Sequence, residues 1–120
     1  MHNYKELKVW KKSVDLATAV YSITYSFPKT EQYGLTQQIR RAVVSISSNI
    51  AEGAGRKYDR EFSHFLSIAY GSLCELETQL LISVNLGFVS NDEISSIINE
   101  ITELQKMIYT LTKTIESITV

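Results

Sequence analysis

The run Gly-Ala-Gly-Arg-Lys at positions 53–57 has the residue types of a phosphate-binding loop. Backbone N–H groups at a helix N-terminus bind anions, and glycines let a ligand approach the backbone closely. The run lacks the complete Walker spacing, however, and no strand pattern precedes it. A helix-to-helix connection explains the glycines better, which leaves Arg56, Lys57 and Arg60 as a cationic cluster at the start of a helix.

Metal-dependent and nucleophilic chemistry find less support. A di-iron helical bundle needs a Glu-x-x-His pair on each of two helices, whereas Glu61 and His64 supply one pair and no histidine follows. Cys74 has no basic neighbour in sequence that would lower its thiol pKa. Glu75 and Glu77 point in different directions on a helix. The sequence therefore predicts no enzymatic activity, no metal site and no cofactor.

Cationic residues are the remaining candidates for binding, and they are unevenly distributed. Residues 1–60 hold ten Lys/Arg against five Asp/Glu, whereas residues 61–120 hold two against eight. The first-half cations can bind phosphate groups, or they can pair with acidic residues of the same or a neighbouring subunit. Both uses stay open. The candidate nucleic-acid-binding residues are Arg40, Arg41, Arg56, Lys57, Arg60, Lys5, Lys8 and Lys12, the three lysines being expected on the outer face of the first helix. Glu75 and Glu77 are expected to form ion pairs with Arg40, Arg41 or Lys106.

Helices are the elements that must position these side chains. Breaks at Pro28, Gly34, Gly53 and Gly87 divide the chain into helices expected at about 5–26, 35–51, 59–86 and 91 to near the end. Asp59 is expected to cap the third helix, and Ser90 with Glu93 forms a capping box before the fourth. Short connections between long helices predict one all-α domain over residues 1–120, an antiparallel up-down four-helix bundle.

Each expected helix carries an apolar face at helical spacing. The four faces comprise Leu7, Trp10, Val14, Ala17, Tyr21 and Thr24; Leu35, Ile39, Ala42, Val43, Ile46 and Ile50; Phe62, Phe65, Leu66, Ala69, Leu73, Leu76, Leu80 and Val84; and Ile94, Ile97, Ile98, Ile101, Leu104, Ile108, Leu111, Ile115 and Ile118.

A line of small residues marks the opposite side of the third helix. Ser67, Gly71, Cys74 and Thr78 recur at a 4-3-4 spacing, and a glycine inside a helix costs about 1 kcal/mol relative to alanine. Small side chains let another backbone approach closely, and Ile68, Leu81 and Ile82 border the line. We therefore expect an oligomer interface there, most simply with a second copy of the chain.

Composition places the protein in a broad class. A single cysteine cannot form an intramolecular disulfide, which is typical of a reducing cytoplasm. The longest apolar runs are far shorter than a membrane span, so we expect no membrane partner and a cytoplasmic location. The net charge of −1 argues against a protein that coats nucleic acid indiscriminately.

Four blocks of the sequence resemble a known family. The chain is similar to the four-helix bundle proteins encoded in intervening sequences of bacterial large-subunit ribosomal RNA genes, and the matching blocks are Leu7–Trp10, Phe27–Ala42, Ser45–Gly53 and Ala69–Thr78. This resemblance implies a bacterial origin, an up-down bundle and assembly into a homopentamer. It extends to the accessory variability determinant of diversity-generating retroelements, which works as a basic pentamer with nucleic acid and a reverse transcriptase. The resemblance brings no catalytic residues.

Two hypotheses about function follow. The first is a non-enzymatic homo-oligomer, a pentamer by resemblance, that binds RNA or other nucleic acid through its basic patches. The alternative is an adaptor or assembly module that contacts another protein and has no nucleic-acid role.

Overall fold

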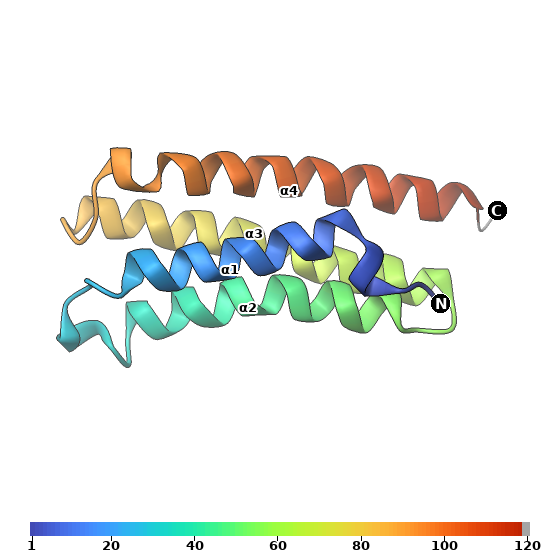
Figure 1. Cartoon of the computed structure of the whole chain (residues 1–120), viewed down its shortest axis with the longest axis horizontal. Coiled ribbons are helices and arrows are strands. Elements are labelled where there is room, and N and C mark those ends of the chain that lie inside the picture. Colours follow the sequence, from blue (N-terminus) through green and yellow to red (C-terminus); the bar gives the residue numbers. More distant parts are fainter. Residues whose placement is uncertain (119–120) are drawn as a thin grey trace.

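The chain folds into four helices that run alternately up and down (Figure 1). The computed structural model describes residues 1–118. Two 3-10 turns, η1 (Tyr4–Glu6) and η2 (Lys29–Glu31), accompany α1 (Lys8–Thr24), α2 (Leu35–Ala54), α3 (Asp59–Asn85) and α4 (Asn91–Ile118). Each helix packs against two others, in the order α1, α2, α3, α4 and back to α1, and α2 against α3 is the most extensive pair. The predicted all-α, antiparallel four-helix bundle is confirmed.

Aliphatic side chains from all four helices fill the core. The fully buried large residues include Ile39 and Ile46 of α2, Leu66 and Leu73 of α3, and a long isoleucine and leucine stripe on α4. These are the faces predicted for the last three helices, although some predicted members are only partly buried: Leu35, Phe65, Val84, Ile98 and Leu111. The side chain of Ile118, placed on the fourth face, lies outside the described residues. Within residues 1–118, no helix is long and apolar enough to cross a membrane.

The apolar face predicted for the first helix is partly wrong. Val9, Ser13, Leu16, Val20 and Thr24 are the buried residues of α1, whereas two members of the predicted face, Val14 and Tyr21, are 37% and 43% exposed. The predicted Thr24 is buried, and Leu7, Trp10 and Ala17 pack against the core while remaining partly exposed. Ser13 was missed because it is polar; its hydroxyl donates to the Trp10 backbone carbonyl at 2.7 Å, as the Thr24 hydroxyl does to the Val20 carbonyl at 2.8 Å.

The helix boundaries also differ from the prediction in places. Residues 4–6 form a separate 3-10 turn, so α1 begins at Lys8 and, with 17 residues, is the shortest of the four helices. The second helix continues three residues beyond Ala51, because Gly53 lets its last turn pack against α3. Asp59 is the first residue of α3 rather than its cap, and Tyr58 stands at the cap position without a side-chain hydrogen bond.

The connection between α3 and α4 matches the sequence prediction. Gly87 has a φ of +77°, the left-handed conformation that glycine adopts without strain. The Ser90 hydroxyl accepts from the Glu93 backbone N–H at 3.1 Å, and the Glu93 carboxylate accepts from the Ser90 N–H at 3.0 Å. Both hydrogen bonds of the predicted capping box are present.

Candidate nucleic-acid interface

The predicted cations divide between two regions of the bundle. A hydrogen bond of 2.7 Å from the His2 backbone N–H to the Ala54 carbonyl fastens the start of the chain to the end of α2. The η1 turn consequently lies beside α2, and Lys5 and Lys8 share one end of the bundle with the α2–α3 connection (Figure 1). Arg56, Lys57 and Arg60 lie at this same end. We call these five residues the basic end.

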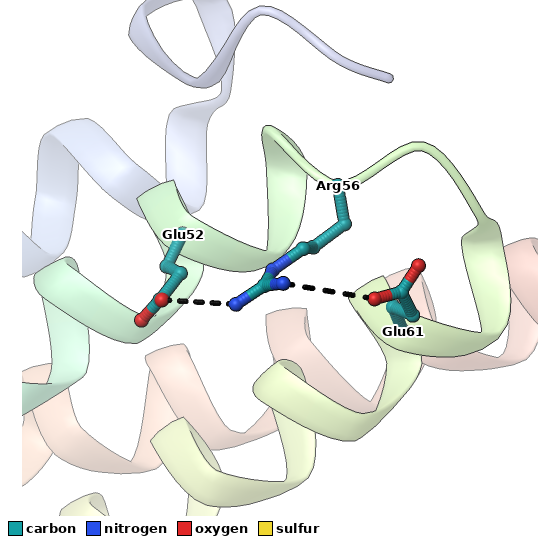
Figure 2. A network of polar contacts seen from close by, with 3 residues as sticks. All are labelled: Glu52, Arg56 and Glu61. Atoms are coloured by element: carbon teal, nitrogen blue, oxygen red, sulfur yellow. Dashed lines mark hydrogen bonds and ion pairs between the residues drawn. The ribbon is translucent and has the colours of Figure 1, made fainter.

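Arg56 is held by protein groups at the basic end (Figure 2). Its guanidinium lies 3.1 Å from the Glu52 carboxylate and 3.8 Å from the Glu61 carboxylate. The guanidinium carbon also lies 4.9 Å from the centroid of the Phe65 ring. Arg56 therefore joins the last turn of α2 to the first turn of α3, and its charge is already offset by two carboxylates.

Lys57 and Arg60 are exposed and make no ion pair with a described residue. Both cations approach the exposed ring of Tyr58, with the Lys57 ammonium 5.5 Å and the Arg60 guanidinium carbon 5.6 Å from its centroid. Asp59, one residue further on, is bonded to the His2 ring at 3.1 Å. An exposed aromatic ring between two cations offers both stacking and phosphate contacts to a nucleic acid.

Lys12 is engaged within the protein and does not extend the basic end. Its ammonium lies 3.0 Å from Glu103 and 3.8 Å from Glu100, so it joins α1 to α4. Hydrogen bonding to Glu103 and the nearby carboxylate charges raise the pKa of Lys12 above its ordinary value. The expected alignment of three lysines on one helix is wrong, because Lys5 belongs to η1.

Arg40 and Arg41 lie in the first half of α2, away from the basic end. Arg40 donates from Nε to the Thr24 hydroxyl at 3.0 Å and from Nη2 to the Tyr21 carbonyl at 3.4 Å, and its guanidinium carbon lies 4.6 Å from the Tyr21 ring centroid. Arg41 is exposed. The expected ion pairs of Glu75 and Glu77 with Arg40, Arg41 or Lys106 are absent among the described residues.

The two arginines border an open cleft of 610 Å³ that the sequence did not reveal. Its walls include Tyr21, Tyr33 and Thr36. The only signal in the sequence was an amide and an aromatic residue, Gln32 and Tyr33, in the short segment before the arginine-bearing helix.

The small-residue line on α3 is solvent-exposed in the single chain. Ser67, Gly71, Cys74 and Thr78 are all exposed, and a Cβ added at Gly71 would meet nothing within 4 Å. Exposed apolar residues, Ile68, Tyr70, Leu81 and Ile82, accompany the line.

Chemically reactive side chains do not gather into a site. Glu61 is ion-paired with Arg56, whereas His64 is exposed and its ring packs edge-on against Phe65. Cys74 is exposed, and the Gln105 amide donates to its sulfur at 3.7 Å. Among residues 1–118, no three His, Cys, Asp or Glu side chains are grouped as metal ligands.

Comparisons with known proteins agree with this architecture. The model of the 23S rRNA-intervening sequence protein family matches residues 5–110. A solved structure, described as a protein of unknown function from the S23 ribosomal protein family of Bacteroides thetaiotaomicron VPI-5482, is similar with a TM-score of 0.78. That likeness has 25% sequence identity and covers 88% of this chain and 98% of the other. No curated protein matches. With most of its length matched by the family model and the same bundle found in a solved relative, the chain belongs to the 23S rRNA-intervening sequence protein family.

Proposed function

We propose that this chain is a non-enzymatic, cytoplasmic, homo-oligomeric bundle that binds RNA. The observation that carries the proposal is the basic end, where the start of the chain is held against the end of α2 and where Lys57 and Arg60 lie beside the exposed ring of Tyr58. A family name that refers to ribosomal RNA is consistent with an RNA partner.

The RNA-binding part of the proposal depends on the cations that no carboxylate neutralises. Lys5, Lys8, Lys57 and Arg60 are exposed and make no ion pair with a described residue. Each phosphate contact releases counterions from the nucleic acid, so a few such cations give salt-dependent affinity. Tyr58 adds a ring surface on which an unpaired base can stack.

The homo-oligomer part rests on the exposed face of α3. Ile68 and Ile82 are exposed on either side of Gly71, where the helix surface is open. Nearby, the buried Gln79 side-chain oxygen has no hydrogen-bond partner among the described residues. A second copy of the chain is the simplest occupant, because it would cover the exposed apolar residues. The state we propose is the pentamer that the resemblance implies.

Assembly and RNA binding reinforce each other in this proposal. A single chain presents four unpaired cations at its basic end and has a net charge of −1, which supports weak binding only. Cyclic symmetry repeats the basic end once per subunit, so one RNA can contact several copies. Such multivalent binding raises the apparent affinity without any new type of contact.

The test combines mass measurement with RNA binding. Light scattering should give a multiple of 13.6 kDa, and the oligomer should shift a structured RNA at low salt with an affinity that falls as salt rises. The double variant Lys57→Gln/Arg60→Gln should lower the slope of log K against log salt by about 2 for each basic end that the RNA contacts. Its control, Lys29→Gln/Lys106→Gln, removes two exposed lysines elsewhere and should bind like the wild type. No shift at low salt, or equal losses in both variants, would refute the RNA-binding proposal.

The alternative is an adaptor or assembly module that contacts a different protein. The same exposed apolar residues of α3 favour it, because nothing in their chemistry requires a second copy. A monomeric mass, together with binding to a purified protein that nuclease does not weaken, would support this alternative over the first.

A further inference from the structure

The cleft beside α2 is lined by cationic, aromatic and amide side chains. It lies between α1, the η2 segment and the first half of α2, and Val44 contributes to its wall. Two guanidinium groups, those of Arg40 and Arg41, border it, and none of its lining residues is acidic. Its volume of 610 Å³ falls within the range of about 300–1,000 Å³ that small-molecule sites occupy.

The two arginines have different surroundings. Arg40 is fixed, because its Nε and Nη2 donate to α1 and its guanidinium stacks on Tyr21. Arg41 is exposed and makes no ion pair with a described residue. A planar guanidinium presents paired N–H donors that match two oxygens of a phosphate group. Arg41 can therefore contact a phosphate directly, while Arg40 adds a positive charge at a fixed position.

A buried hydroxyl without a hydrogen-bond partner lies beside the cleft. Thr36 is only 6% exposed, yet its Oγ1 has no hydrogen-bond partner among the described residues. Most buried hydroxyls are hydrogen-bonded, and leaving one unpaired costs stability. Thr36 lines the cleft and also the smaller pocket next to it. Because this oxygen is itself buried, a ligand atom in the cleft reaches it only if the Thr36 side chain rotates.

The aromatic residues indicate what else the ligand carries. Tyr33 lines the cleft and is 84% exposed, so most of its ring is accessible. Tyr21 also lines the cleft, and the Arg40 guanidinium lies over its ring. Base-to-aromatic stacking needs an accessible ring, and it tolerates any base. Gln32 and Gln37 line the cleft as well, and their amides provide hydrogen-bond donors and acceptors.

We propose that this cleft binds one nucleotide, with the phosphate at Arg41 and the base against Tyr33. The nucleotide is either free or an unpaired residue of an RNA chain, since both present the same phosphate and base. If the nucleotide belongs to an RNA chain, this proposal rests on the proposed RNA-binding function. If the nucleotide is free, the proposal is independent of that function.

The experiment titrates the purified full-length oligomer with three probes: uridine monophosphate, a fluorescent single-stranded uridine 20-mer, and a fully paired RNA duplex of the same length. Tyr33→Ala should weaken binding of the 20-mer by about tenfold, which is within the range measured for loss of one stacked base. Arg41→Gln should reduce its salt slope by about 1. The matched controls, Tyr109→Ala and Lys106→Gln, change an exposed tyrosine and an exposed lysine on α4 and should bind like the wild type.

The outcomes separate this inference from the proposed function. Loss of binding to the 20-mer in Tyr33→Ala and Arg41→Gln, with the duplex unaffected, supports an unpaired RNA nucleotide in the cleft. Binding of uridine monophosphate alone, sensitive to the same variants, supports the cleft as a site for a free nucleotide. If neither uridine monophosphate nor the uridine 20-mer binds, or if Tyr33→Ala and Arg41→Gln match their controls, the inference is overturned. RNA binding that then depends only on Lys57 and Arg60 would leave the proposed function standing.

Discussion

Two glycines in the helices should respond in opposite directions to replacement by alanine. Gly71 lies on the exposed face of α3, and an added Cβ would meet nothing within 4 Å. Gly53 is buried in the last turn of α2, where an added Cβ would lie 2.6 Å from the Phe65 Cβ and 3.0 Å from the Phe62 Cδ1. Both changes remove the same entropic disadvantage of glycine in a helix. The contacts around the new methyl group therefore decide the difference.

The magnitudes follow from these distances. At a dilution where the chain is monomeric, Gly71→Ala should raise the free energy of unfolding by about 0.5–1 kcal/mol, the helix-propensity difference at an open site. At Gly53 the Phe65 Cβ cannot move away by rotating its side chain, so α3 must shift away from α2. Overpacking of this kind costs about 1–3 kcal/mol. After the propensity gain is subtracted, Gly53→Ala should be destabilising by about 1–2 kcal/mol.

Urea denaturation followed by circular dichroism measures both effects. With a slope of about 2 kcal/mol per molar urea, the midpoint should rise by about 0.3–0.5 M for Gly71→Ala and fall by about 0.5–1 M for Gly53→Ala. Repeating the titrations at tenfold dilution shows any contribution of self-association, which makes stability concentration-dependent. If Gly53→Ala stabilises the protein as much as Gly71→Ala does, the close packing of α2 on α3 described above is incorrect.

Three further predictions concern the α3 face, the capping box and Lys12. Gly71→Leu should reduce the mass measured by light scattering while the helical circular dichroism signal is kept, and an unchanged mass would argue against an interface at this position. Ser90→Ala should lower the free energy of unfolding by about 1 kcal/mol, because the Glu93 N–H loses its cap; Ser96→Ala, an exposed position further along α4, should not destabilise. The pKa of Lys12 is higher in the folded chain than in the unfolded chain, where a lysine has a pKa of about 10.4. Its ion pairs therefore contribute their full stabilisation below pH about 10.4, and this contribution is lost as the pH rises through the pKa of Lys12 in the folded chain. The stability difference between wild type and Lys12→Met should accordingly be constant at neutral pH and shrink in strong alkali, and a difference that grows there would contradict the assigned pairing.

The sequence predicted most of the fold, because three of the four helices carry apolar residues that dominate their buried faces. On α1 the buried stripe includes Ser13, whose hydroxyl donates to its own helix, and hydrophobicity alone cannot identify such a position. The first helix was also predicted to be longer than it is. The turn that separates Lys5 from α1 is fixed by tertiary contacts with α2, which periodicity does not report.

The candidate site was less predictable, because it depends on which residues meet across helices. Arg56 and Lys57 are neighbours in sequence, yet one is clamped by two carboxylates and the other is exposed. Lys12 has the sequence pattern of a surface lysine, and only the packing of α4 on α1 brings Glu103 next to it. The cleft requires the segment before α2 to fold back beside α1, and no local pattern specifies that path.

The Glu52–Arg56–Glu61 network at the α2–α3 connection has a consequence for recognition. By joining both helices across a four-residue connection, it fixes the backbone that carries Lys57 and Tyr58 before any partner arrives. A ligand that contacts these side chains need not order the connection first, so little conformational entropy is lost when it binds. Preorganisation of this kind lets a small number of contacts produce a measurable affinity.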